Sequence, residues 1–140
     1  MIQPLIMLAA VSLAALISNE MLGYELAYEI GYGVFTLMAA MISATFLWLW
    51  MRRATPLAIG MFFGWAGASG VLGWLWVYRL LEHPSWMVKN PLLFIFLSVY
   101  FVGAMLHFEV IGRSFGLDER VYYLPVALCA VATLAAHFFI

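Results

Sequence analysis

The amino-acid sequence predicts an all-α fold: a polytopic integral membrane helical bundle with five transmembrane helices. Composition is the first observation behind this prediction. Of the 140 residues, 67% are hydrophobic and 9% are charged, whereas soluble domains carry about 25% charged residues. The second observation is a series of apolar segments of about 20 residues, the length that a helix needs to cross a bilayer. The third is a glycine-rich segment near the middle of the chain, which we expect to form the central third helix.

The chain is predicted to be a single transmembrane domain, residues 1–140. Its expected spans are 3–22, 30–50, 56–79, 91–113 and 121–140. The first apolar segment has neither a basic n-region nor a convincing A-x-A cleavage site, so we interpret it as a spanning helix and not as a signal peptide. Residues 19–33 are more polar, and we expect them to connect the first two spans at the membrane surface. The second half of this segment is also a candidate for helix.

Aromatic residues followed by charges mark the ends of the expected spans. The second span ends in Trp48 and Trp50, followed by Arg52 and Arg53, which is typical of an aromatic belt and a charged stop at the membrane interface. The third span begins at Pro56, a residue that suits the first turn of a helix.

The third span carries five glycines that are three or four residues apart. They are Gly60, Gly64, Gly67, Gly70 and Gly73. On a helix this spacing forms a ridge without side chains, and small residues of this kind let membrane helices approach each other closely. The ridge is a single stripe from Gly60 to Gly67 and then drifts around the helix, so we expect more than one neighbouring helix to pack against it.

Charged connections predict the orientation of the chain. With five spans, Arg52, Arg53, Arg113 and Arg120 fall on one side of the membrane, and Arg79 and Lys89 fall on the other. The positive-inside rule then places the N-terminus in the cytoplasm and the C-terminus outside, and we expect a bacterial inner (plasma) membrane. The net charge of −1 suggests no attraction to nucleic acid, and the single cysteine excludes an internal disulfide.

His107 is a candidate intramembrane polar residue. Counting along the fourth span puts it at the depth of Gly60 and Gly64, where missing side chains leave room for a flat ring, so haem or quinone is a candidate cofactor. A histidine that is hydrogen-bonded inside the bundle is the simpler interpretation. Trp65 lies near mid-membrane and could either fill space or contact a ligand. A haem with two axial ligands needs a second ligand at similar depth; His83 and His137 are expected near the outer surface, so only a partner subunit could supply it.

Glu109 and Arg113 are the other intramembrane candidates. They are four residues apart with the acid first, the favoured order for an ion pair along a helix. A self-contained ion pair near the headgroups is one interpretation. The alternative is that Glu109 forms a proton or cation site, or pairs with a helix of a partner.

Acidic and histidine side chains gather in the connections predicted to lie outside. They are Glu20, Glu25, Glu29, Glu82, His83 and His137. Carboxylate and imidazole ligands could hold a divalent cation, and a solvated acidic rim is the simpler interpretation. Glu25 and Glu29 are four residues apart and would repel each other on a helix, which favours solvent or a basic partner beside them.

The sequence contains no nucleotide-binding loop, Gly-x-Ser-x-Gly, H-E-x-x-H or C-x-x-C motif, so we expect no catalytic activity of the chain itself. The preferred hypothesis is an accessory or structural subunit that packs within a larger membrane complex, beside other subunits or copies of itself. A small homo-oligomeric transporter or channel that uses Glu109, Glu20 or Glu29 is the alternative. A haem- or quinone-binding anchor subunit is the third.

Overall fold

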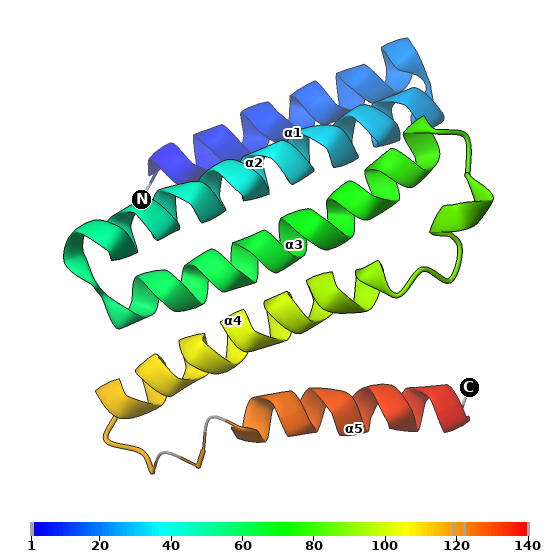
Figure 1. The fold of residues 1–140 in the computed structure, drawn as a ribbon. Coiled ribbons are helices and arrows are strands. Elements are labelled where there is room, and N and C mark those ends of the chain that lie inside the picture. Colours follow the sequence, from blue (N-terminus) through cyan, green and yellow to red (C-terminus); the bar gives the residue numbers. More distant parts are fainter. Residues whose placement is uncertain (1, 119, 122, 140) are drawn as a thin grey trace.

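The computed structural model describes residues 2–118, 120–121 and 123–139, and within them the fold is all α-helical (Figure 1). The helices are α1 (Ile2–Leu22), α2 (Tyr24–Arg53), α3 (Pro56–Leu80), α4 (Leu92–Ser114) and α5 (Tyr123–Phe139). A short 3-10 turn, η1 (Ser85–Met87), lies between α3 and α4. The predicted all-α bundle is thus confirmed. Tyr122 and Ile140, both assigned to the fifth span, lie outside the described residues.

Four helices, α1 to α4, are each long and apolar enough to cross a membrane, as judged by length and composition. In contrast, α5 has 17 residues. At 1.5 Å per residue it is about 26 Å long, slightly less than the hydrocarbon core of about 30 Å. The prediction that this segment also spans the bilayer therefore stays a prediction.

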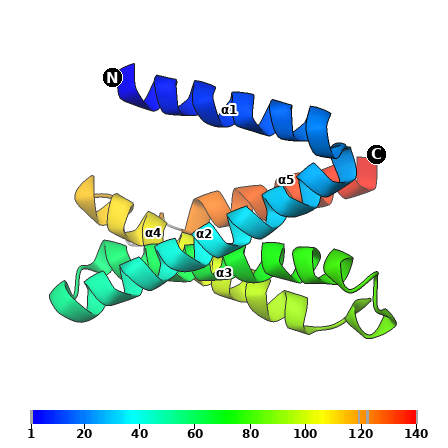
Figure 2. The same ribbon diagram turned by 90° about the horizontal axis from the view of Figure 1, so that it is seen from above.

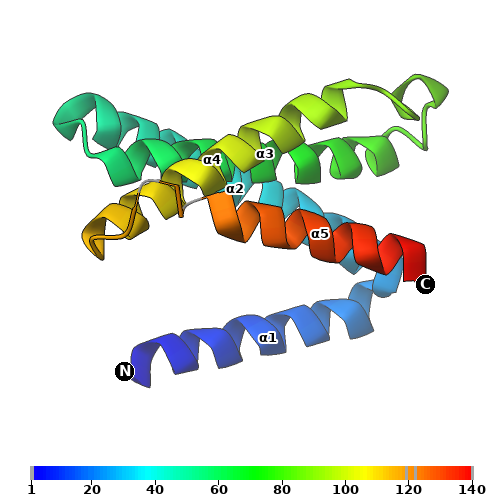
Figure 3. The ribbon, with the colours of Figure 1, turned by 90° about the horizontal axis from the view of Figure 1, so that it is seen from below.

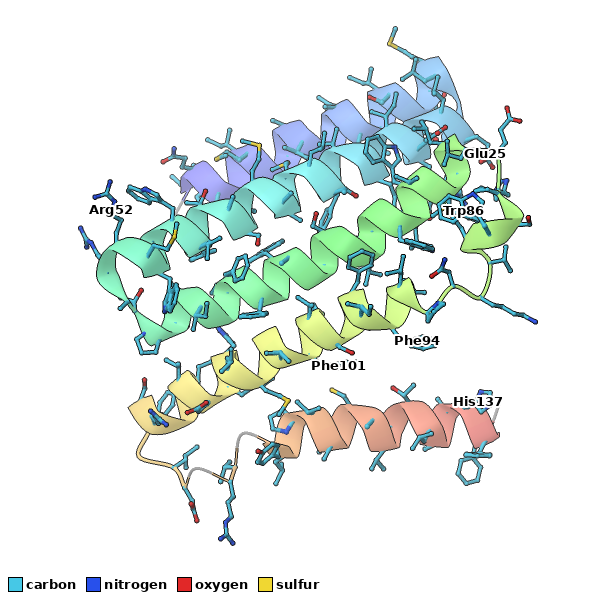
Figure 4. All side chains as sticks on the ribbon, in the orientation of Figure 1. Glu25, Arg52, Trp86, Phe94, Phe101 and His137 are labelled. Carbon is cyan, nitrogen blue, oxygen red and sulfur yellow. The ribbon has the colours of Figure 1, made fainter. Side chains whose placement is uncertain are left out.

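Successive helices run in alternating directions, so the start of α1 and the end of α5 lie at opposite ends of the bundle (Figure 1). One end carries the connections α2–α3 and α4–α5, and the other carries α1–α2 and α3–α4. Figure 4 shows Arg52 at the first end and Glu25, Trp86 and His137 at the second.

The centre of the bundle is α3, which packs between α2 and α4 (Figure 1). The buried residues of these three helices are all small: Gly33, Thr36, Ala39 and Ser43 on α2, Ala58, Gly60 and Gly67 on α3, and Gly103 on α4. Ala39 is only 1% exposed and Ala58 only 2%. The core therefore depends on the close approach of helix backbones and not on large interdigitating side chains.

The two outer helices are much less engaged. Neither α1 nor α5 buries any of its described residues. Figures 2 and 3 show that α1 diverges from the bundle and comes near α2 at the end where the two helices are joined. The main neighbour of α5 is α4.

The predicted surface connection 19–33 is almost entirely helical, and α2 is longer than the expected span 30–50. Gly23 alone separates α1 from α2, with a φ of +80° that favours glycine. Its backbone stays within the helical pattern, because its N–H donates to Asn19 O at 3.0 Å and its carbonyl accepts from Ala27 N at 3.1 Å. The polar composition therefore marks the exposed end of a helix and not a loop.

The connection between α2 and α3 has two residues, Ala54 and Thr55. Ala54 adopts a left-handed φ of 49°, and its N–H donates to Trp50 O at 2.6 Å, which closes the end of α2. Pro56 follows in the first turn of α3, as the sequence predicts.

Candidate functional site

Three glycines of α3 lie against α4, Gly60 and Gly67 against its backbone and Gly70 against the Phe96 side chain. A Cβ atom built on Gly60 would lie 3.1 Å from the backbone nitrogen of His107, and one on Gly67 would lie 2.5 Å from the Cα of Tyr100. Farther along, a Cβ on Gly70 would lie 2.6 Å from Cγ of Phe96. Since real Cβ atoms do not approach other atoms closer than 3.0 Å, Gly67 and Gly70 leave no room for a side chain at the present helix separation.

The ridge serves two neighbours. Gly73 faces α2, where an added Cβ would lie 3.0 Å from Cγ2 of Thr36, and Gly33 of α2 in turn receives the ring of Trp76. The ridge thus faces α4 as far as Gly70 and α2 at Gly73, so its drift brings it to a second neighbour only at its last glycine.

Gly64 is the exception among the five, because a Cβ built on it would meet no atom within 4 Å. It lines a groove of about 400 Å³ between α3 and α4. The other lining residues are Gly60, Met61, Trp65 and Ala68 of α3 and Tyr100, Gly103, Ala104, His107 and Phe108 of α4. The structure therefore brings His107 and Trp65, which the sequence singled out separately, into one cavity beside two glycines of the ridge.

The imidazole of His107 has an unusual environment. Its Nδ1 is buried and has no hydrogen-bond partner among the described residues. The simpler interpretation was a histidine that is hydrogen-bonded inside the bundle. At Nδ1, the described residues provide no such hydrogen bond. The ring of the following residue, Phe108, lies 6.1 Å away between centroids at an interplanar angle of 69°.

Glu109 and Arg113 form the ion pair that their spacing predicts, with Nη2 of Arg113 2.6 Å from Oε1 of Glu109. The Arg113 side chain is 62% exposed and that of Glu109 is 28% exposed. Both line a groove of about 450 Å³ beside Pro56 and Ile59 at the start of α3. The carboxylate of Glu109 is thus paired with an arginine of its own helix.

The candidate outer rim does not come together as a cation site. Among the described residues, no group of three or more His, Cys, Asp or Glu side chains is placed to hold a metal ion. His83 packs edge-on against Tyr78 of its own segment, with ring centroids 4.8 Å apart. Glu20 and Glu82 are exposed, Glu29 is half-buried, and His137 lies exposed at the end of α5 (Figure 4).

Glu25 has the basic partner that the repulsion between Glu25 and Glu29 favours. Nη1 of Arg79, at the end of α3, lies 3.6 Å from Oε2 of Glu25, at the start of α2. The guanidinium of Arg79 also lies over the ring of Tyr28 at 4.5 Å. These contacts join two helices at one end, and because both charged groups are exposed, the ion pair contributes little to stability.

Two serine hydroxyls link α2 to α3, and the sequence analysis did not identify them. Oγ of Ser43 donates to Phe62 O at 3.1 Å, and Oγ of Ser69 donates to Thr36 O at 3.0 Å. The available signal was a serine on the small-residue face of an apolar helix, because such hydroxyls often donate across a helix interface.

The sequence matches no known protein-family model, and neither a curated protein nor a solved structure is significantly similar to it.

Proposed function

We propose that the chain is a polytopic protein of the bacterial inner membrane that serves as a structural subunit of a larger membrane assembly. In this proposal all five helices span the bilayer, with the start of α1 in the cytoplasm and the end of α5 outside. The four long apolar helices support membrane insertion. The distribution of arginine and lysine between the two ends supports the orientation.

The observation that carries the proposal is the contrast between α3 and the outer helices. Small residues on a membrane helix permit close helix contact, and α3 uses its glycines in this way. The outer helices are also rich in small residues: Ala9, Ala10, Ser12, Ala14, Ala15 and Ser18 on α1, and Ala127, Ala130, Ala132, Ala135 and Ala136 on α5. Yet neither helix buries any described residue.

We infer that helices of another subunit, or of a second copy of this chain, pack against α1 and α5. The divergence of α1 from α2 supports this inference, because it leaves a face of α1 that the described part of the chain does not cover (Figures 2 and 3). The engagement of Glu109 with Arg113 also favours a structural role over transport through this carboxylate.

Blue-native electrophoresis in mild detergent, combined with site-specific photocrosslinking, tests the proposal. A photoreactive residue at Ala14 of α1 or at Ala132 of α5 should yield crosslinks to a second polypeptide, identified by mass spectrometry. The matched control is Ala58 on α3, which is 2% exposed and should crosslink within the chain only. Migration as a free small particle, with no crosslink from either outer helix, would contradict the proposal.

A further inference from the structure

The groove between α3 and α4 has the size and the lining of a ligand site. Its volume of about 400 Å³ falls within the range of about 300–1,000 Å³ that is common for small-molecule pockets. Gly64 forms part of its floor, and the space that a side chain at this position would fill is empty of protein atoms. Trp65, Tyr100 and Phe108 supply aromatic surface, which favours a flat ring.

His107 determines which chemical group such a ring must carry. His107 lines the groove, and its Nδ1 is buried without a partner among the described residues, whereas Nε2 is not among the buried atoms that lack a partner. A neutral imidazole has one N–H donor and one acceptor nitrogen. We assign the proton to Nε2, because the other tautomer would leave a buried N–H at Nδ1 without an acceptor. Nε2–H is then a donor that a ligand in the groove can reach, and it requires an acceptor oxygen.

The same nitrogen argues against haem iron as the ligand. A histidine that binds a metal through Nε2 almost always donates its Nδ1–H to a carboxylate, a carbonyl or water. Within residues 2–118, 120–121 and 123–139, Nδ1 of His107 has no such acceptor. A second axial histidine is also out of reach, because His137 lies at the opposite end of the bundle from the start of α3, where His107 faces Gly60 (Figure 4).

We propose that the groove binds the head group of a lipid-soluble quinone. Nε2–H of His107 donates to a quinone carbonyl, and Trp65 and Tyr100 flank the ring. Gly64 and Gly103 keep the space beside the ring open. The inference is independent of the proposed role in an assembly, because all the residues of the groove come from this one chain.

Photoaffinity labelling of the purified full chain in nanodiscs tests this site. The probe is an azido-ubiquinone, competed by unlabelled decylubiquinone, and labelled residues are mapped by mass spectrometry. We expect competed labelling within residues 60–68 and 100–108. His107→Leu should weaken competition about tenfold, the equivalent of one hydrogen bond of about 1.4 kcal/mol, whereas His107→Gln, which retains an N–H donor, should weaken it less.

Gly64→Leu provides the test that does not depend on the histidine. A Cβ at this position meets no atom within 4 Å, so the added side chain is expected to enter the groove and abolish competed labelling while the protein stays folded. The matched control is Gly112→Leu on α4, where an added Cβ also meets no atom within 4 Å and which does not line the groove. The proposal would be overturned if decylubiquinone did not compete with the labelling. It would also be overturned if labelling were equally strong in Gly64→Leu and Gly112→Leu.

Discussion

Gly103 of α4 lies directly on the backbone of Gly64 of α3, since a Cβ atom on Gly103 would be 2.5 Å from Gly64 Cα. The relationship is not reciprocal, because a Cβ on Gly64 would meet no atom within 4 Å and would enter the groove. Glycine is therefore required at 103 for helix contact, whereas at 64 it leaves space for something other than protein.

Gly103→Ala should destabilise the bundle. The added methyl forces α3 and α4 apart, and overpacking of this kind costs about 1–3 kcal/mol. Titration with SDS from mild detergent, followed by circular dichroism, measures the free energy of unfolding. Gly112→Ala on the same helix is the control and should change it by less than about 0.5 kcal/mol. Equal effects of the two substitutions would show that α3 and α4 are not in backbone contact at Gly103.

Ser69→Ala should also weaken the contact between α2 and α3. It removes the hydroxyl that donates to Thr36 O, and a hydrogen bond of this type contributes about 0.5–1.5 kcal/mol. The same unfolding assay applies. The control is Ser98→Ala, because the exposed Ser98 hydroxyl bonds only to Phe94 O of its own helix, at 2.7 Å. If Ser98→Ala lowered the free energy of unfolding as much as Ser69→Ala, the effect would come from a bond within one helix and not from the contact between α2 and α3.

Glu109 and Arg113 should behave as a weak ion pair that depends on salt. A double-mutant cycle with Glu109→Gln and Arg113→Gln is expected to give a coupling of at most about 1 kcal/mol, because Arg113 is largely exposed. Raising the salt concentration tenfold should reduce the coupling through screening. Proton flux into proteoliposomes is the second measurement, and a loss of flux in Glu109→Gln would favour the transport alternative.

Cysteine labelling should reveal the orientation of the bundle. In a Cys129→Ser background, a membrane-impermeant maleimide should label Ser85→Cys in intact spheroplasts. Thr55→Cys, in the connection at the opposite end, should be labelled only after lysis. Both native positions are exposed, so the reagent can reach them. The reverse pattern would invert the orientation, and labelling of both positions from outside would contradict the span count between them.

Periodicity explains why much of the central packing could be predicted. Glycines spaced by three or four residues define one face of a helix whatever surrounds it, and counting residues along antiparallel spans was enough to place His107 opposite Gly60. The ion pair of Glu109 and Arg113 followed from spacing within one helix. These predictions depend only on local geometry, which the sequence fixes directly.

Contacts between helices were harder to predict. The hydrogen bond from Ser69 to Thr36 depends on the rotation of α3 against α2, which a glycine pattern alone does not specify. The pairing of Glu25 with Arg79 depends on the extension of α2 back to Tyr24. The sequence offered helix for the second half of 19–33, but the three glutamates there favoured a connection at the membrane surface, so a helix start as early as Tyr24 was not predicted.

The two-residue connection of Ala54 and Thr55 bears on the biogenesis of the protein. Three virtual bonds of 3.8 Å keep the Cα atoms of Arg53 and Pro56 within about 11 Å of each other at every stage. If a newly made α2 entered lipid alone, the Ser43 hydroxyl would lack the Phe62 carbonyl that accepts its hydrogen bond in the folded protein. We therefore expect α2 and α3 to leave the insertion machinery together as one helical hairpin, against which α4 packs afterwards.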